Sequence, residues 1–242
     1  MGSVLTRYFE RLADLDSSDR AALDSLALFP HRHLRAREDS FREGDPCSSV
    51  SVLISGWACL SKMTERGDRQ IISFVLPGEP CDCEDYLLGV HGVTLQAITD
   101  IEQLSIPAER LELAFEDRPK LLLAFRRAGA IRLASVEDRM LTVGRRPASA
   151  RLGLLFLDIM ARAKRAGIGT DDGCEFPVTQ LDLADACGLT SVHVNRTLKT
   201  MRKAGIIDLR YRHLSILKAD ELRALVAFSP SPVDLVIETN LN

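Results

Sequence analysis

The segment at residues 179–204, TQLDLADACGLTSVHVNRTLKTMRKA, constrains the fold of this 242-residue chain more than any other. It predicts two short helices joined by a tight turn. Thr179 and Asp182 have the spacing of a capping box, in which both side chains accept hydrogen bonds from free backbone N–H groups where a helix starts. Gly188 lies where that helix must stop, because glycine readily adopts the left-handed conformation of a helix end. Thr190 is placed to cap the second helix.

The second helix is predicted to have one buried face and one open face. The buried stripe consists of residues at i, i+4 and i+7, namely Val194, Leu198 and Met201. The open face carries Val192, Asn195, Arg196, Lys199 and Lys203. The apolar face of the first helix is predicted to comprise Leu181, Leu183, Ala184 and Ala186. Two such helices with a short glycine-containing turn are typical of a helix-turn-helix, whose second helix enters the major groove of DNA.

The pair Asn195–Arg196 suits base reading, since Arg can form two hydrogen bonds with guanine and Asn two with adenine. A helical hairpin with a solvated charged face would show the same pattern, so the flanking charge has to distinguish the two. The net charge of the whole chain is only −3. However, residues 1–144 carry 17 Lys and Arg against 23 Asp and Glu, whereas residues 145–218 carry 13 against seven. A basic block inside an acidic chain is the charge distribution of a DNA-binding domain.

Upstream of the helix-turn-helix, the spacing of apolar residues changes from a helical pattern to the alternating pattern of strands and back to a helical one. Residues 5–27 are predicted to be helical, with a break and a cap near residues 16–18. Between residues 29 and 107, short alternating runs are separated by turns at Gly56, Gly67-Asp68, Pro77-Gly78 and Asp100. Many short strands with glycine-containing turns predict a small barrel or roll.

After the strands, residues 108–119 predict a short helix and residues 121–144 a long one. The long helix has a seam of residues spaced by three and four, Leu122, Phe125, Gly129, Leu133, Val136, Met140 and Val143. A single buried helix would explain this seam too. We expect its arginines to leave one face solvated, namely Arg126, Arg127, Arg132 and Arg139. Pairing with a second copy is therefore expected.

The remaining segments complete a winged helix-turn-helix. Residues 149–166 predict an amphipathic helix, followed by a loop over residues 167–177. Beyond the helix-turn-helix, two short strands around Arg212-His213 predict a wing. A short helix and a loose tail from residue 229 are expected to end the chain.

This order of elements resembles the CRP/FNR superfamily of bacterial transcription regulators over about residues 5–228. The segments that carry the resemblance are VLISGWACLSK and GDRQIISFVLPGE in the roll and VTQLDLADACGLTSVHVNRTLKTMRKAGII in the helix-turn-helix. The resemblance implies an α+β fold with an N-terminal double-stranded β-roll of the cyclic-nucleotide-binding kind. The expected parts are residues 1–107 (helices and β-roll), 108–144 (connecting or dimerisation helix), 145–218 (winged helix-turn-helix) and 219–242 (C-terminal helix and tail). It also implies a homodimer that binds a two-fold operator in double-stranded DNA and recruits or blocks RNA polymerase.

The resemblance implies that the base-reading positions are Ser191, Val192, Asn195 and Arg196. Many family members have a glutamate where this chain has Val192, so an acceptor for cytosine is replaced by a residue that contacts methyl groups. The operator should then differ from the best-known family consensus at that base. We expect phosphate contacts from Thr179, Thr190, His193, Lys199, Arg210, Arg212 and His213.

The sensor segment departs from that of cyclic-nucleotide-binding relatives, which hold the phosphate with an Arg–Ser pair and the ribose with a Gly–Glu pair. Residues 70–109 contain no Lys or Arg. A cyclic phosphate beside Asp82, Glu84 and Asp85 would lack a counter-charge, so we expect no binding of cyclic AMP in the standard mode. An N-terminal iron–sulfur cluster is not expected either, because the first cysteine is Cys47. Haem sensing stays open, since nothing identifies a ligand among the five histidines.

The remaining sensor candidate is Cys81-x-Cys83, which has acidic neighbours and is followed by His91. On a strand, both thiols would point to one face. Two small residues that fill the core at a strand end would fit the same sequence. The effector or redox candidates are therefore Cys81, Asp82, Cys83, Glu84 and His91, with no bound metal expected and the cofactor unknown.

Two other function classes have weaker support. A cupin-like metal enzyme would need clustered His and Glu on the roll strands, which only His31 and His33 with Glu84 and His91 offer, so we expect no catalytic residue. An effector-binding module without DNA function is opposed by the basic wing. The cytoplasm is the expected compartment and no membrane partner is expected. The reasons are that no apolar run approaches the ~18 residues of a membrane span, no apolar signal segment begins the chain, and six scattered cysteines fit free thiols.

Overall fold

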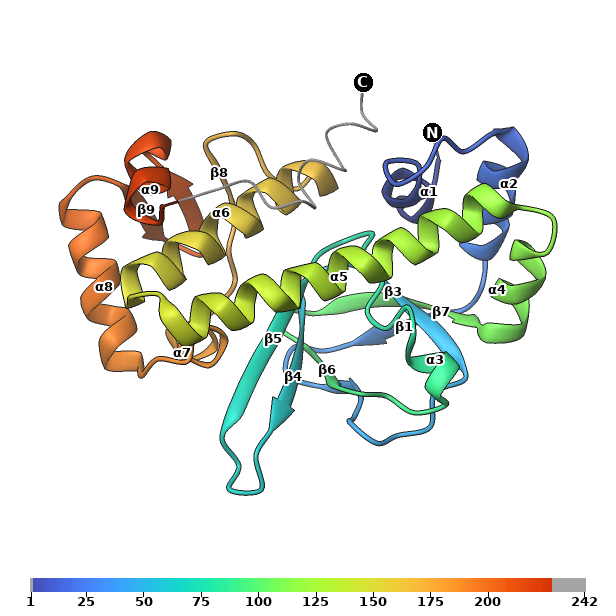
Figure 1. Cartoon of the computed structure of the whole chain (residues 1–242), viewed down its shortest axis with the longest axis horizontal. Helices are drawn as coiled ribbons and strands as arrows, with labels where there is room; N and C mark the ends of the chain where they lie inside the picture. Colours follow the sequence, from blue (N-terminus) through green and yellow to red (C-terminus); the bar gives the residue numbers. More distant parts are fainter. Residues whose placement is uncertain (1, 228–242) are drawn as a thin grey trace. The chain divides into compact units, whose positions relative to one another are not determined.

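The computed structural model describes residues 2–227 (Figure 1). Contacts within the described chain divide it into two compact units. The first contains residues 2–62 and 73–136, and the second contains residues 63–72 and 137–227. The long helix α5 (Pro119–Arg145) contributes to both units. The four-part division expected from the sequence stays a prediction.

Two short helices open the first unit, α1 (Val4–Phe9) and α2 (Ser17–Leu26). The Asp16 carboxylate accepts hydrogen bonds from the backbone N–H groups of Ser18 and Asp19, at 2.8 and 3.0 Å. The Asp19 carboxylate in turn accepts the N–H of Asp16 at 3.0 Å, which completes a capping box. The break predicted near residues 16–18 is thereby confirmed, because this box starts a new helix there.

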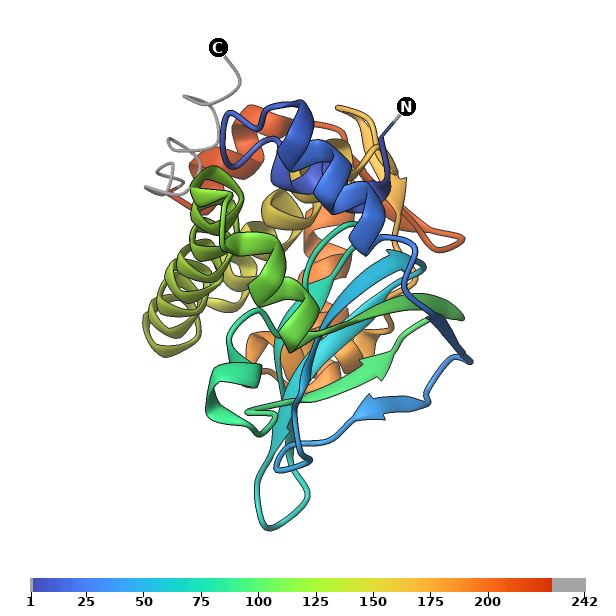
Figure 2. The same cartoon turned by 90° about the vertical axis from the view of Figure 1, so that its right-hand side faces the viewer.

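Two sheets form the β-roll, which Figure 2 shows as the strands coloured from blue to green. The first sheet has the order β1-β7-β3 and consists of β1 (His31–Leu34), β7 (Ile101–Pro107) and β3 (Ser49–Ser55). The second has the order β2-β6-β4-β5 and consists of β2 (Asp39–Phe41), β6 (Thr94–Ala97), β4 (Ala58–Met63) and β5 (Arg69–Val75). The predicted strands on either side of Gly56 and Asp100 are confirmed. At Gly56 the backbone φ is 81°, and a Cβ there would collide with the carbonyl oxygen of Asp100, so this turn requires glycine.

Two apolar clusters fill the first unit. One lies between the helices and the sheet β1-β7-β3, where the rings of Phe9 and Phe125 stack with centroids 4.0 Å apart. The other lies among the strands and includes Leu53, Leu60 and Leu95. The strands thus separate two cores within one unit.

Three helices follow the strands or connect them: α3 (Asp85–Leu88), α4 (Ala108–Phe115) and α5. The short α3 was not predicted, whereas α4 and the long α5 were. The first half of α5 packs into the core of the first unit through Leu121, Ala124, Phe125, Ala128 and Gly129. Further along, Leu133 is 61% exposed and Met140 is 76% exposed. The predicted seam is therefore half core and half open apolar surface.

The arginines of α5 are less solvated than predicted. Arg126 is exposed, but Arg127 donates a hydrogen bond to the carbonyl oxygen of Leu12. The side chain of Arg139 is only 20% exposed and lies 3.9 Å from the Asp158 carboxylate. Periodicity alone did not anticipate the partners that draw these side chains inward.

The second unit is a winged helix-turn-helix. Its elements are α6 (Ala148–Ala166), β8 (Gly173–Glu175), α7 (Gln180–Cys187), α8 (Ser191–Lys203), β9 (Ile207–Arg210), β10 (His213–Ile216) and α9 (Ala219–Leu225). The strands pair in the order β8-β10-β9. The predicted loop at residues 167–177 was wrong in part, since β8 pairs there with β10 and adds a third strand to the wing. The tail predicted from residue 229 lies outside the described residues. Among residues 2–227, no helix is both long and apolar enough to cross a membrane.

Candidate functional sites

The helix-turn-helix is fixed by the caps that its sequence predicts. The Asp182 carboxylate accepts the backbone N–H of Thr179 at 3.1 Å and its hydroxyl at 2.6 Å, while the Thr179 hydroxyl oxygen accepts the N–H of Asp182 at 3.1 Å. Gly188 ends α7 with a φ of 60°. The Thr190 hydroxyl oxygen then accepts the N–H of His193 at 3.3 Å and starts α8. Both threonine hydroxyls therefore have structural roles in addition to any contact with phosphate.

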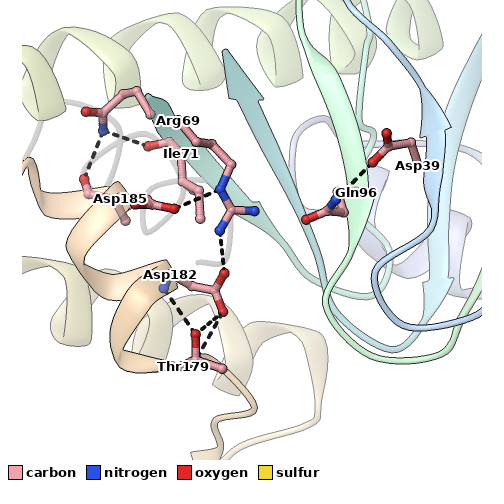
Figure 3. Close-up of polar contacts among 9 residues, drawn as sticks. Asp39, Arg69, Ile71, Gln96, Thr179, Asp182 and Asp185 are labelled. Atoms are coloured by element: carbon pink, nitrogen blue, oxygen red, sulfur yellow. Dashed lines mark hydrogen bonds and ion pairs between the residues drawn. The ribbon is translucent and has the colours of Figure 1, made fainter. Parts of the chain in front are cut away.

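An ion pair that sequence reasoning missed anchors α7 (Figure 3). Arg69 belongs to residues 63–72, the part of the hairpin β4–β5 that lies in the second unit. Its Nη2 lies 2.7 Å from Asp182 Oδ1 and its Nε lies 2.8 Å from Asp185 Oδ2. Asp182 is fully buried, so the guanidinium supplies the counter-charge that a buried carboxylate requires. No local pattern identifies this pair, because its members are more than 100 residues apart.

The recognition helix α8 exposes most of the residues predicted to read bases. Val194, Leu198 and Met201 are buried, as predicted. Ser191 and Arg196 are exposed, and Val192 is 76% exposed. Asn195 is half-buried, and its Nδ2 donates a hydrogen bond to Gln180 Oε1 at 3.1 Å. One assignment on α7 was wrong. Leu181 was placed on the apolar face, but it is 60% exposed because it lies on the opposite side of α7 from Leu183.

The wing turns one residue earlier than predicted. Tyr211 and Arg212 both have positive φ angles, 52° and 59°, as the two central residues of a type I′ hairpin turn do. Tyr211 is 99% exposed, and Arg210 lies 3.0 Å from the Asp208 carboxylate. Two residues other than glycine in left-handed conformations at an exposed tip are strained. All predicted phosphate-binding residues belong to the second unit and are exposed: Thr179, Thr190, His193, Lys199, Arg210, Arg212 and His213.

The predicted Cys81-x-Cys83 site does not form. These cysteines lie in the turn before α3 rather than on a strand, so their thiols diverge. Cys81 packs into the cluster among the strands, whereas Cys83 packs into the cluster beneath the helices. Burial raises the pKa of both thiols, which disfavours the reactive thiolate. They fill two cores, which was the alternative considered from the sequence.

Asp82 and His91 do come together, and they meet Cys47, which sequence reasoning missed. The ligand atoms of these three residues lie within 4.8 Å of one another, and all three residues are buried. His91 Nδ1 lies 3.5 Å from Asp82 Oδ2 and 3.6 Å from Asp85 Oδ2. We call Cys47, Asp82 and His91 the sensor cluster. Cys47 lies 35 residues before Asp82, so no spacing motif identifies it.

Glu84 points away from this cluster towards α5. Its side chain is half exposed, and its Oε2 lies 3.7 Å from Arg132 Nη2. The same Arg132 nitrogen lies 4.0 Å from Asp85 Oδ1. Residues 70–109 contain no cationic Lys or Arg side chain of their own, so Arg132 brings a cation from α5 to this acidic segment.

The cupin-like grouping of His31 and His33 with Glu84 and His91, which the sequence disfavoured, does not form. His31 Nδ1 lies 2.6 Å from Glu102 Oε1 at the edge of the roll, and this contact raises the pKa of His31. Within the described residues, the sensor cluster is the one group of three His, Cys, Asp or Glu residues close enough to share a metal ion, and it includes neither His31 nor His33.

A β-roll, a long helix and a winged helix-turn-helix with an open basic recognition helix define a class of DNA-binding transcription regulators. Residues 31–118 match the cyclic nucleotide-binding domain family, and residues 150–225 match the Crp-like helix-turn-helix domain family. The chain belongs to the CRP/FNR superfamily.

Its relatives agree with this assignment. The chain is 29% identical to the nitrogen fixation regulation protein FixK of Bradyrhizobium diazoefficiens over 86% of this chain and 89% of that protein. It is 26% identical to the transcriptional activator protein anr of Pseudomonas aeruginosa, over 80% of this chain and 79% of that protein. The solved structure of FixK2 from Bradyrhizobium japonicum superposes with a TM-score of 0.75 and 25% identity, over 83% of this chain and 98% of the other.

Proposed function

We propose that this chain is a sequence-specific transcription regulator that binds a two-fold DNA operator as a homodimer and recruits or blocks RNA polymerase. The observation that carries the proposal is the geometry of α8. The apolar stripe of α8 is buried in the core of the second unit, and the residues suited to base edges remain on the open side of the helix. The relatives of this chain are named as regulators and activators of transcription. We propose no catalytic role for any residue.

The proposed reading positions are Ser191, Val192, Asn195 and Arg196. Arg196 is exposed and suited to a bidentate contact with guanine. Asn195 is held by Gln180 from α7, so its amide is oriented before DNA arrives. Val192 presents methyl groups rather than a carboxylate, which favours contact with a thymine methyl over an acceptor for cytosine.

The proposed dimer contact is the open apolar part of α5. Leu133 and Met140 are one heptad apart and mostly exposed, so they form a stripe along one side of the helix. A second copy of α5 is the proposed occupant, because a two-fold operator requires two recognition helices. The change of Leu133 and Met140 to Asp should convert a dimer to a monomer in analytical ultracentrifugation. Ser135→Asp, on the opposite side of the same helix, is the control and should leave the dimer intact.

The DNA-reading assignment is tested by selecting binding sites from random duplex DNA. The wild-type protein should enrich a two-fold sequence. Arg196→Ala should lower affinity for that sequence by roughly 5- to 150-fold and relax selection at one base pair in each half-site, the range expected for a bidentate contact. Arg223→Ala removes an exposed arginine of α9 and is the control, which should change neither the affinity for the selected sequence nor the base preference. An Arg196→Ala protein with unchanged affinity and base preference would show that α8 is not the reader.

We also propose that the roll does not bind cyclic AMP in the standard mode. Arg132 lies close to the acidic segment and already faces Glu84 and Asp85. A buried phosphate would have to compete with these carboxylates for it. Isothermal titration calorimetry should show no binding at micromolar cyclic AMP. Micromolar affinity would contradict this part of the proposal without affecting the assignment of α8.

A further inference from the structure

Three loops of the roll converge on the sensor cluster. Cys47 precedes β3, Asp82 precedes α3, and His91 precedes β6. Backbone hydrogen bonds hold two of these loops together, since the N–H of Cys47 donates to the Gly89 carbonyl at 3.0 Å. The N–H of His91 likewise donates to the carbonyl of Asp45 at 2.9 Å. The cluster is thus built by the fold and does not depend on long flexible side chains.

Two polar atoms of the cluster are buried and lack a hydrogen-bond partner, Asp82 Oδ2 and His91 Nδ1. Asp82 is fully buried and His91 is 7% exposed. Such orphaned groups are costly, and native proteins rarely keep them unless something unrepresented in the protein satisfies them. The two atoms lie 3.5 Å apart.

Neighbouring groups hold these two side chains in place. The imidazole of His91 stacks on Phe41, with ring centroids 3.7 Å apart and planes within 6°. The other carboxylate oxygen of Asp82 accepts the N–H of Ser51 at 2.7 Å. With these contacts in place, the ligand atoms of Asp82, His91 and Cys47 lie within 4.8 Å of one another. The Cys47 thiol donates only a weak hydrogen bond, 3.4 Å long, to the Ser49 carbonyl.

We propose that the sensor cluster is a binding site for a divalent transition-metal ion of the zinc class, with Cys47 Sγ, Asp82 Oδ2 and His91 Nδ1 as ligands. Zinc–ligand bonds of about 2.0–2.3 Å in a tetrahedron separate neighbouring ligand atoms by roughly 3.3–3.8 Å. The observed spacing of 3.5 Å between the carboxylate oxygen and the ring nitrogen already falls in this range. The group as a whole, within 4.8 Å, needs only a small contraction.

The chemistry of the donor set selects the metal. A thiol and an imidazole disfavour calcium and magnesium, which prefer oxygen ligands, and favour zinc and its first-row neighbours. Asp85 Oδ2 lies 3.6 Å from His91 Nδ1 and already accepts the N–H of Gly92 at 2.9 Å, so it can serve as a fourth ligand or orient a bound water. This site differs from the sequence-based expectation of no metal, which did not place Cys47 beside Asp82 and His91.

Burial raises the pKa of Asp82 to about 7 and raises that of the Cys47 thiol, whereas it lowers that of His91. All three shifts favour neutral side chains when no ion is present. A divalent cation reverses this preference for the thiol and the carboxylate, since coordination stabilises the deprotonated forms.

The test uses the full-length protein, stripped with a chelator and titrated with Co²⁺ and then Zn²⁺. Co²⁺ should bind with one equivalent per chain and give a near-ultraviolet thiolate-to-cobalt charge-transfer band together with tetrahedral visible bands. Zn²⁺ should displace it and raise the Tm. Cys47→Ser should abolish the charge-transfer band, and His91→Gln should weaken binding at least tenfold. Cys59→Ser, which removes a buried thiol of β4 outside the cluster, is the matched control and should bind like the wild type.

Several results would overturn the proposal. One is a wild-type protein that binds no Co²⁺, which would leave the cluster to a buried water. Another is Co²⁺ binding without a thiolate band. A third is binding that survives both Cys47→Ser and His91→Gln, which would place the metal at exposed groups such as His31 or His33. Because the wild-type cobalt spectrum reports the thiolate directly, the test holds even if one variant fails to fold.

Discussion

The ion pair between Arg69 and α7 allows a quantitative prediction about what holds the helix-turn-helix in place. Arg69→Met removes the guanidinium from two carboxylates while keeping an extended side chain. Asp182 would remain in its fully buried position with Oδ1 deprived of its charged partner at 2.7 Å. Asp185, whose side chain is 19% exposed, can recruit water and should contribute less.

The expected loss in the free energy of unfolding follows from the burial of Asp182 and from the hydrogen bonds that its carboxylate keeps. Removing one partner of a buried ion pair costs about 3–5 kcal/mol, because the remaining charge is uncompensated. Here Asp182 keeps two hydrogen bonds from Thr179, and the Arg69 side chain is 19% exposed. We therefore expect a loss of about 2–3 kcal/mol in the free energy of unfolding, below the usual range. For a chain of this length that corresponds to a fall in Tm of roughly 5–10 °C.

A double-mutant cycle separates the pair from general disruption of the hairpin. Urea unfolding is measured for Arg69→Met, Asp182→Asn and the combined variant. The combined variant should be less destabilised than the sum of the two, with a coupling of at least about 1 kcal/mol. Arg66→Met is the matched control, since Arg66 is exposed in the same hairpin, and it should change stability by less than about 0.5 kcal/mol. Additive losses within about 0.5 kcal/mol, or an equal effect of Arg66→Met, would refute the reasoning.

Three further predictions concern single turns and one ion pair. Replacing Tyr211 with Asn and Arg212 with Gly suits the type I′ turn and should raise the free energy of unfolding by roughly 1–3 kcal/mol. The same double variant lacks the Arg212 side chain, so it should bind any DNA duplex more weakly in fluorescence anisotropy. Gly56→Ala should lower the Tm by more than about 5 °C in a thermal melt, because a Cβ meets a backbone carbonyl at a positive φ. Glu102→Gln should lower the pKa of His31, which an NMR titration measures. Because the pKa of His31 is raised in the folded protein, the stabilisation by the ion pair is complete below the pKa of the unfolded chain, about 6.5. This stabilisation is lost as the pH rises through the pKa of the folded protein. The difference in stability between the wild type and Glu102→Gln should therefore shrink at higher pH.

The elements that the sequence predicted correctly are those determined by neighbouring residues. The caps at Thr179 and Thr190 and the left-handed Gly188 depend on contacts within four residues, so they can be recognised without knowing the rest of the fold. The break before α2 has the same origin. Strands were located where alternation was flanked by turn residues, as on both sides of Gly56.

The features that the sequence did not reveal depend on contacts between distant segments. The strand β8 is three residues long and exists because β10 pairs with it. Arg69 and Asp182 have no local signature. The turn that separates Cys81 from Cys83 ends the expected strand, so two thiols assigned to one face enter two different cores. Local patterns therefore predicted the elements of the helix-turn-helix well and the surroundings of Asp82 and His91 poorly, because those surroundings are assembled from loops.

The position of the sensor cluster relative to α5 gives it a direct structural connection to the proposed dimer contact. Asp82, Glu84 and Asp85 occupy one turn, and the last two face Arg132 of α5. A Cβ at Gly129 would overlap the Glu84 carboxylate, so α5 passes this turn at a residue that leaves room for it.

Any change in charge or position of the carboxylates in this turn must therefore act on Arg132, one residue before Leu133, which we propose to lie in the dimer contact. A metal ion bound at Asp82 would attract the neighbouring Asp85 carboxylate and compete with Arg132 for it. The first unit thus carries both the proposed metal site and a charged contact that links the turn of Asp82, Glu84 and Asp85 to α5 beside Leu133.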